Sequence, residues 1–280
     1  MRIKITSDST CDLSNELIEK NNIRIIPLAI TYGAESYKDG VDITPDDIFR
    51  RVESGGGIGS TAAVNVQEYV DIFTELLKDY DAIIHFTISS DMSSCYQNAC
   101  IAAQNLSNVY VIDSLNLSTG IGHLVLDAAE LAGEGKQPEE IVRIIENKRE
   151  KLDVSFVIST LEYLSKGGRC SAVAAFGANL LKIRPCIEVK NGKMGVGKKY
   201  RGSFEKCLTQ YVQDKLENKE SLDLKRIFIT DSGVPEEVRL AVREQVLSIA
   251  PFEEVIHTRA GCTVSNHCGP GTLGILFYRK

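Results

Sequence analysis

Residues 82–105 read AIIHFTISSDMSSCYQNACIAAQN and join an apolar strand pattern to a helix pattern. Residues 82–88 form an apolar run of strand length, and a helix is expected over residues 94–105. The polar segment between them, residues 89–94, is typical of a turn that leads into a helix. This order predicts one strand–turn–helix unit of an α/β sheet.

The same alternation extends through the N-terminal half. Thr44 followed by Pro45 predicts the start of one helix, and Asn65 with Glu68 three residues on predicts the start of another. The other expected elements are strands at 2–5, 23–32 and 109–112 and helices at 14–20, 119–134 and 138–151. Parallel strands need crossover connections, so we expect a parallel sheet with helices on both faces.

The second half of the chain has a different pattern. A strand is expected at 154–159, and a helix of small residues at 171–181. Asn191-Gly192 lies between two expected strands, 186–190 and 193–196, which is a strong hairpin signal. We therefore expect an α/β protein with two lobes, a parallel-sheet lobe at 1–152 and an α+β lobe with an antiparallel element at 153–280.

Composition narrows the class of protein. Of 280 residues, 43% are hydrophobic and 25% charged, with a net charge of −6, which is ordinary for a globular protein. Without a basic block, nucleic-acid binding is not expected. Without a long apolar run or a signal sequence, we expect no transmembrane segment and a cytoplasmic location. The eight scattered cysteines form no CxxC pair, so we expect reduced, buried side chains and no metal site.

Several expected turns are rich in serine and threonine. They cover residues 6–10, 89–94 and 113–119, and Ser60 and Thr61 precede a further helix. The carboxyl ends of parallel strands share one edge, where ligands of open α/β sheets bind. Hydroxyls and free N–H groups at helix starts suit an anion, so we expect a carboxylate or phosphate there. Helix capping alone would explain any single turn.

Two other segments attract attention. Arg169 follows a Gly-Gly turn at 167–168, which places a cation next to a sharp bend, although a helix end with a surface arginine would look the same. His267 lies in a loop rich in glycine and proline, a setting that often carries function. We expect His85 and His123 in the core and His257 at the surface.

Common catalytic motifs are missing. The sequence has no phosphate-binding GxxxxGK[ST] loop, no GxSxG and no HExxH, and the glycines at 55–59 do not follow an expected strand. A polar sheet edge without such motifs favours a binding protein. An enzyme acting on a small phosphorylated or carboxylated metabolite, and an interaction module without a pocket, stay as alternatives.

Five segments, read together, resemble the DegV family, whose FakB-like members are bacterial fatty-acid-binding subunits of a fatty acid kinase. The segments are TSDSTCDL at 6–13, ISSDMS at 88–93, VIDS at 111–114, LEYLSKGGR at 161–169 and HCGPG at 267–271. They span nearly the whole chain in the family's order. Beside two of its usual motifs the chain departs from the family's sequence, at 62–65 and 94–95.

The resemblance implies a long-chain fatty acid as ligand, no other cofactor, and an ATP-dependent fatty acid kinase as partner. Thr61 and Ser93 would hydrogen-bond the carboxylate, while Arg169 and His267 would line the same polar mouth and assist transfer. The partner would form the acyl phosphate, and this chain would not be an enzyme. The small residues at 172–178 are a candidate tunnel wall, although close helix packing explains them equally well.

Overall fold

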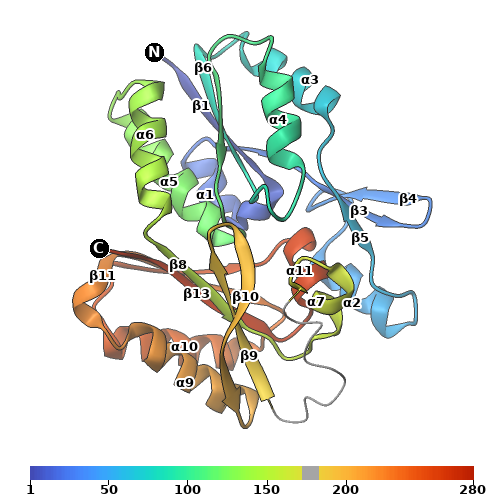
Figure 1. Cartoon of the computed structure of the whole chain (residues 1–280), viewed down its shortest axis with the longest axis vertical. Coiled ribbons are helices and arrows are strands. Elements are labelled where there is room, and N and C mark those ends of the chain that lie inside the picture. Colours follow the sequence, from blue (N-terminus) through green and yellow to red (C-terminus); the bar gives the residue numbers. More distant parts are fainter. Residues whose placement is uncertain (172–182) are drawn as a thin grey trace.

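A computed structural model describes residues 1–171 and 183–280. These residues form three sheets, with the parallel sheet above and the largest sheet below in the view of Figure 1. The predicted class, α/β with a parallel sheet and a second, partly antiparallel sheet, is confirmed.

The N-terminal sheet has four parallel strands in the order β2-β1-β6-β7. They are β1 (Ile3–Asp8), β2 (Arg24–Ile26), β6 (Ala82–Thr87) and β7 (Val109–Asp113). The surrounding helices are α1 (Asn15–Lys20), α3 (Val66–Leu76), α4 (Cys95–Ala103), α5 (Thr119–Gly133) and α6 (Pro138–Arg149). Figure 1 shows α5 and α6 on one side of this sheet and α3 and α4 on the other. Every residue of β6 is buried, which explains its uninterrupted apolar pattern.

A three-stranded antiparallel sheet was not expected. Its strands are β3 (Ala29–Tyr32), β4 (Glu35–Lys38) and β5 (Ser60–Ala62), in the order β4-β3-β5. The single strand predicted at 23–32 is therefore wrong, because β2 and β3 belong to different sheets. Pro27 lies between them, and a proline cannot donate a backbone hydrogen bond to a sheet. Between β4 and β5 runs α2 (Pro45–Glu53), capped by Thr44 as predicted.

The C-terminal half is built on a six-stranded mixed sheet in the order β10-β9-β8-β13-β11-β12. Its strands are β8 (Leu152–Val157), β9 (Ile183–Lys190), β10 (Lys193–Arg201), β11 (Leu222–Ser232), β12 (Glu254–Arg259) and β13 (Thr272–Arg279). Only β11 and β12 pair in parallel. The predicted hairpin is confirmed, because β9 and β10 are joined at Asn191 and Gly192, both with positive φ.

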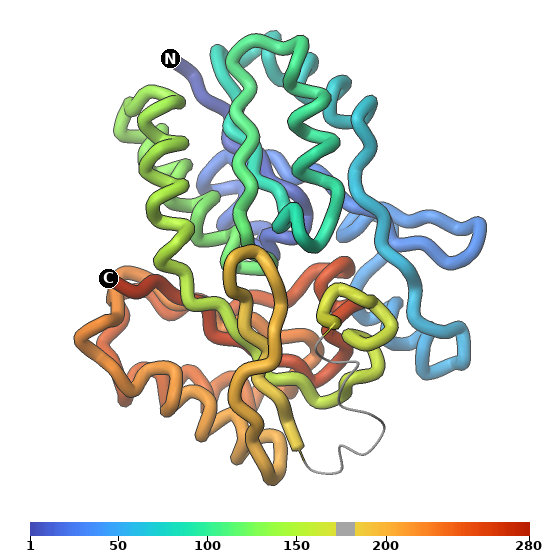
Figure 2. Tube along the Cα trace, in the orientation of Figure 1, coloured from blue at the N-terminus to red at the C-terminus, as the bar shows by residue number. Residues whose placement is uncertain are grey.

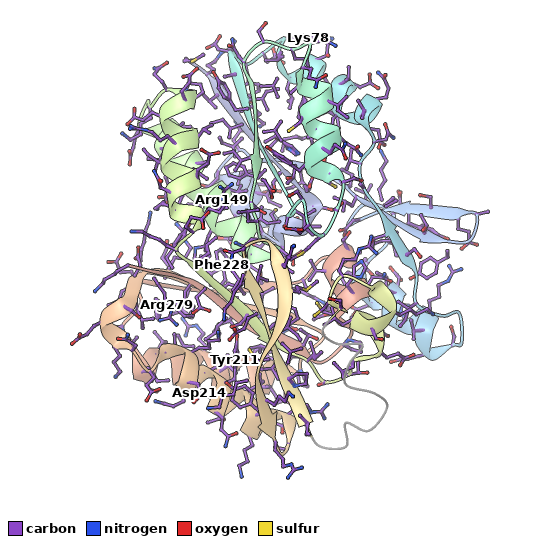
Figure 3. All side chains as sticks on the ribbon, viewed as in Figure 1. Lys78, Arg149, Tyr211, Asp214, Phe228 and Arg279 are labelled. Atoms are coloured by element: carbon purple, nitrogen blue, oxygen red, sulfur yellow. The ribbon has the colours of Figure 1, made fainter. Side chains whose placement is uncertain are left out.

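The two faces of the large sheet pack against different layers. On one face, Ile227 and Ile275 pack with α9 (Phe204–Leu216) and α10 (Glu236–Ile249). On the other face, Phe228 and Leu276 join the core of the parallel sheet and α5. This alternation follows from the two-residue period of a strand. Figure 3 labels Phe228 on the large sheet and Tyr211 on α9.

One apolar core therefore runs through both halves of the chain. Residues Thr119–Ala128 of α5 are buried between the parallel sheet and the large sheet. The large sheet begins at Leu152, next to the expected boundary of the lobes, and the division into 1–152 and 153–280 stays a prediction.

Two short helices complete the junction. They are α7 (Glu162–Gly167) and α11 (Cys262–Cys268), which contact each other. Figure 2 shows α11, near the red end of the colour scale, next to α7 and close to segments from the N-terminal half. It contacts α2, β3, β5 and the 3₁₀ turn η1 (Ser9–Cys11). The remaining 3₁₀ turn is η2 (Lys219–Ser221).

Candidate functional site

A cavity of about 210 Å³ lies where the three sheets meet. Its walls come from β5, the turn after β6, the segment before α5, the end of α7, β10 and α11. The lining residues are Leu28, Thr61, Ala62, Ala63, Ile88, Met92, Ser93, Ser94, Leu117, Arg169, Met194, Thr263, Val264, His267 and Cys268. All four residues proposed from the sequence, Thr61, Ser93, Arg169 and His267, therefore line one cavity.

Thr61 and His267 form the closest polar pair in the wall. The Thr61 hydroxyl oxygen lies 2.8 Å from His267 Nε2. Thr61 is on β5, an element that the sequence did not predict, and His267 is near the end of α11. Burial, together with the positive charge of Arg169, lowers the pKa of His267 to about 4. The imidazole is therefore neutral at pH 7 and acts through hydrogen bonds.

A close backbone approach fixes the imidazole of His267. A Cβ on Gly167, the last residue of α7, would lie 2.1 Å from His267 Nδ1. Only glycine leaves room for the ring at this position. The glycine pair 167–168 therefore does more than end α7, because its first member packs against a cavity residue.

Ser93 belongs to the turn between β6 and α4. Its hydroxyl accepts a hydrogen bond from the Cys95 N–H at 3.3 Å and donates its proton to Cys95 Sγ at 3.2 Å. Ser93 is half-buried, so its side chain reaches both the cavity and the start of α4. Because a hydroxyl has only one proton, Ser93 donates to a ligand only when its O–H turns away from the weak acceptor Cys95 Sγ.

Arg169 is exposed and follows α7. Its guanidinium donates to the Gly167 carbonyl at 2.8 Å and, from Nε, to the Met92 carbonyl at 3.4 Å. It is the only charged side chain among the described residues that line the cavity. The positive charge of Arg169 therefore lies on the solvent-exposed side of the cavity.

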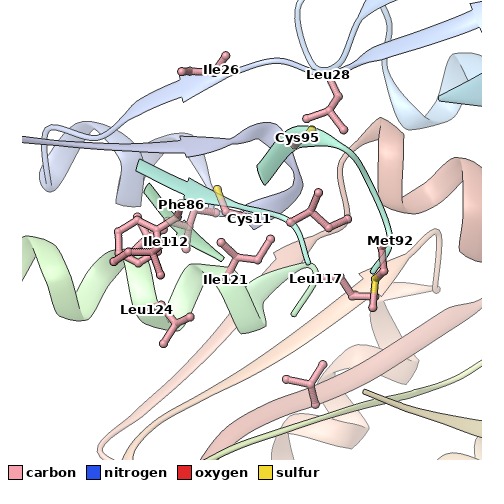
Figure 4. Close-up of a cluster of buried hydrophobic side chains, with 14 of the residues drawn as sticks. Cys11, Ile26, Leu28, Phe86, Met92, Cys95, Ile112, Leu117, Ile121 and Leu124 are labelled. Carbon is pink, nitrogen blue, oxygen red and sulfur yellow. The ribbon is translucent and has the colours of Figure 1, made fainter. Parts of the chain in front are cut away.

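The rest of the cavity is largely apolar. Figure 4 labels Leu28, Met92 and Leu117 together with deeper core residues. A second, smaller cavity of about 20 Å³ shares Leu117, Val264 and Cys268 with the first and reaches toward β8, β11 and β13. The candidate tunnel wall at 172–178 lies outside the described residues.

The first serine-rich turn does not line the cavity. Asp8 instead accepts hydrogen bonds from the Tyr69 hydroxyl and the Ile88 N–H, and Ser9 donates to Asp39. These groups are bonded within the protein. The 89–94 turn lines the cavity and residues 6–10 do not, and ligand contact at the 89–94 turn stays a prediction.

Sequence reasoning missed most of α11. Thr263, Val264 and Cys268 line the cavity besides His267. The only signal for them was the glycine-rich and proline-rich surroundings of His267. Positions 62, 63 and 94, where the chain departs from the family's usual sequence, also line the cavity.

The other histidines lie away from the cavity. His85 and His123 are fully buried, as expected, and burial lowers the pKa of His123 to about 4. His257 is exposed, as expected, and its Nε2 lies 2.6 Å from Asp231 Oδ2.

Seven of the eight cysteines are buried and Cys100 is half-buried, in agreement with the sequence-based expectation. Within residues 1–171 and 183–280, no cluster of His, Cys, Asp or Glu is arranged to hold a metal ion. In the same ranges, no helix combines the length and apolar composition that a membrane crossing requires.

The fold and the site define a class: α/β proteins of two sheet layers with a largely apolar cavity and a hydroxyl-lined mouth at their junction. The chain belongs to the DegV family. A family profile described as "uncharacterised protein, DegV family" matches residues 2–280. A DegV domain-containing protein of Clostridium acetobutylicum is 35% identical over 283 residues, which cover 100% of this chain and 99% of that protein.

Solved structures are similar over the whole chain. A DegV family protein of Thermus thermophilus, described by its fatty acid binding, has a TM-score of 0.92 and 31% identity, with 100% of both chains covered. DegV of Bacillus subtilis, described as a fatty acid binding protein, has a TM-score of 0.87 and 27% identity, also with 100% of both covered. A stearic-acid-binding protein of Eubacterium ventriosum has a TM-score of 0.87 and 26% identity, covering 99% of this chain and 98% of that one.

Proposed function

We propose that this chain binds a long-chain fatty acid in the cavity, in the cytoplasm, with the carboxylate at Thr61 and Ser93. One observation carries the proposal: two hydroxyls, from β5 and from the turn after β6, line one cavity whose remaining wall is largely apolar. The similarity to solved proteins that are described as fatty acid binding supports it. The apolar wall favours this ligand over a small charged metabolite.

The Thr61–His267 pair would orient the head group. A hydroxyl can accept one hydrogen bond and donate its own proton. If His267 Nε2–H donates to Thr61, the Thr61 proton points to the carboxylate. The imidazole, which is neutral at pH 7, would thus orient the Thr61 hydroxyl without adding a charge to the site. Ser93 would donate to the second carboxylate oxygen.

The tail would supply most of the affinity. Burying about fifteen methylene and methyl groups contributes on the order of 12 kcal/mol before binding costs, at about 0.8 kcal/mol each. Ordering of the chain and loss of translational freedom offset much of this gain. Leu28, Met92, Leu117 and Val264 are among the apolar side chains that line the cavity and would contact the tail. The hydroxyls would then fix the orientation of the head group and contribute the smaller share of the affinity.

The finer proposal is that the chain presents the carboxylate to a partner kinase and does not catalyse the step itself. Arg169 supports it, because this cation is exposed while it lines the cavity. An arginine there would attract the phosphates of a bound nucleotide on the partner. The carboxylate oxygen would attack the γ-phosphorus of ATP, and ADP would leave, which yields the acyl phosphate.

Mass spectrometry of the purified protein tests the ligand. The protein is expressed in bacteria, purified, denatured and extracted with organic solvent, and the Thr61→Val/Ser93→Ala double variant is treated identically. We expect about one fatty acid per chain from the wild type and clearly less from the variant. A wild-type extract without fatty acid, which also fails to take up added hexadecanoic acid, would contradict the proposal.

A further inference from the structure

The N-terminus of α11 is held by two aspartate carboxyl groups from distant parts of the chain. Asp12 Oδ1 accepts a hydrogen bond from the Gly261 N–H at 2.8 Å. Asp39 accepts two more, from the Cys262 N–H at 2.7 Å and the Thr263 N–H at 3.1 Å. The cap residue Gly261 has no side chain for this task, so Asp12 and Asp39 perform the capping.

Both carboxyl groups are themselves fixed in place. Asp12 and Asp39 are 5% and 4% exposed, so neither is free to move into solvent. The Ser118 hydroxyl donates to Asp12 at 2.5 Å, and the Ser9 hydroxyl donates to Asp39 at 2.9 Å. Buried carboxylates persist when hydrogen bonds compensate for lost hydration, and they are favoured at a helix N-terminus.

The held helix carries the polar end of the cavity. α11 is a short rigid rod of about 10 Å at 1.5 Å per residue, so a shift at its start moves its end. Its end places His267 Nε2 2.8 Å from the Thr61 hydroxyl. Loss of the hydrogen bonds from the Cys262 and Thr263 N–H groups to Asp39 therefore changes the hydrogen bond between His267 and Thr61.

We infer that Asp39 and Asp12 are positioning residues, which hold α11 so that His267 orients the Thr61 hydroxyl. Neither residue lines the cavity, so they act through α11 and not on a ligand. The inference on hydrogen-bond geometry stands without a ligand, and its consequence for fatty acid binding rests on the proposed function.

The two aspartates differ in what can replace them. Asp39 receives one N–H on each oxygen, so an asparagine there would place its NH₂ group against an N–H donor. Asp12 receives one N–H, and its other partner is the Ser118 hydroxyl, which can also accept. Burial raises the pKa of Asp12 to about 8, in keeping with a position that tolerates a neutral side chain. Asparagine also adopts the left-handed backbone of Asp12, whose φ is 51°.

NMR of the His267 imidazole tests the inference directly in the ligand-free protein. The signals are assigned with His267→Gln, and Asp39→Asn is compared with the matched control Asp12→Asn. We expect shifted or broadened His267 signals in Asp39→Asn and wild-type signals in Asp12→Asn. Wild-type signals in a folded Asp39→Asn protein would overturn the inference.

A second comparison applies if Asp39→Asn does not fold. Asp12→Gly keeps the positive φ but removes the carboxyl group, while Asp12→Asn keeps the acceptor. We expect the His267 signals to move in the glycine variant only. Equal signals in both variants and the wild type would overturn the inference.

Binding of hexadecanoic acid and hexadecan-1-ol then separates this inference from the proposed function. In Asp39→Asn we expect affinity for the acid to fall about tenfold and affinity for the alcohol to stay within about twofold. If the wild type binds neither, the proposed function fails, and the NMR result still decides the role of Asp39. If acid and alcohol weaken equally, Asp39 supports the fold and not the head-group site.

Discussion

The Thr61 hydroxyl lies 2.8 Å from His267 Nε2, although 206 positions separate the two residues in the chain. Thr61 comes from a three-residue strand and His267 from a seven-residue helix, each too short to be stable alone. Packing at the junction of the sheets holds the pair together. The site is therefore a product of the tertiary fold, and several consequences can be measured.

Removal of the Thr61 hydroxyl should weaken binding of fatty acids selectively. Thr61→Val keeps the shape and removes the proton that would point to the carboxylate. A hydrogen bond to a charged group contributes about 1.5–3 kcal/mol, so affinity for hexadecanoic acid should fall roughly tenfold to hundredfold. Displacement of a fluorescent fatty acid measures this change. Thr61→Ser, which keeps the hydroxyl, should bind as the wild type does, and equal affinity for all three proteins would place the carboxylate elsewhere.

Ser93→Ala should also weaken binding of hexadecanoic acid, by up to about tenfold. Because Thr61 and Ser93 would share one carboxylate, their effects should not be additive. A double-mutant cycle with Thr61→Val measures the coupling by calorimetry. Strict additivity of the two free energies would indicate that the hydroxyls act on separate groups.

Arg169→Gln should impair formation of acyl phosphate by a partner kinase more than it impairs retention of fatty acid. The side chain is exposed, so solvent weakens its pull on the bound carboxylate. A radioactive phosphate assay and the displacement assay measure the two effects side by side. Arg169→Lys keeps the charge but not the planar guanidinium group. Its rate of acyl phosphate formation should lie between those of the wild type and Arg169→Gln. Equal losses of binding and turnover would argue against a separate role in transfer.

Stability should fall as the pH decreases from about 6.5 to 4. His267 has a pKa of about 4 in the folded protein and about 6.5 when unfolded, so the unfolded chain binds more protons in this window. Stability from this group is present above pH 6.5 and is lost toward pH 4, by at most about 3 kcal/mol. Urea unfolding at pH 7, 5 and 4 measures it. His267→Gln should lose less stability over the same range, and an identical loss would exclude His267 as a source.

A partly buried ion cluster should stabilise the contact between α5 and the large sheet. Arg226 on β11 is 5% exposed and contacts Asp127 at 3.3 Å, Glu130 at 2.8 Å and Glu254 at 2.7 Å. Arg226→Met would remove one of the two cations that pair with the buried Asp127 carboxylate and leave Lys148 as the other, so the free energy of unfolding should fall by about 2 kcal/mol. Urea unfolding at neutral pH measures it.

Arg259 offers a matched control for Arg226, because it pairs with Asp46 at the surface. Arg259→Met should cost no more than about 1 kcal/mol. A similar loss in the free energy of unfolding of both variants would mean that burial does not increase the contribution of Arg226 to stability.

The sequence predicted the elements whose signals are local. The apolar run of β6, the caps Thr44 and Asn65, and the Asn191-Gly192 turn all depend on neighbours within a few residues. β5 was missed because three residues show no periodicity. The N-terminal capping of α11 could not be predicted, because its partners are 223 to 249 positions away.

Local sequence features singled out the turns that contain Thr61 and Ser93 and the segments around Arg169 and His267, and the family resemblance assigned the four residues to one ligand site. Local patterns indicated that hydroxyls would gather at a sheet edge, but they also favoured residues 6–10. In the structure those residues bond to the protein itself, as the Ser9 contact with Asp39 shows. Local capping signals and ligand-binding signals use the same residue types, so only tertiary contacts can separate them.

A crystal structure of the protein with hexadecanoic acid tests the central claim most directly. The account predicts the carboxylate within hydrogen-bond distance, about 3 Å, of both the Thr61 and the Ser93 hydroxyl, with the tail beside Met92 and Leu117. A carboxylate bound away from both hydroxyls, or a cavity that stays empty at saturating fatty acid, would contradict it.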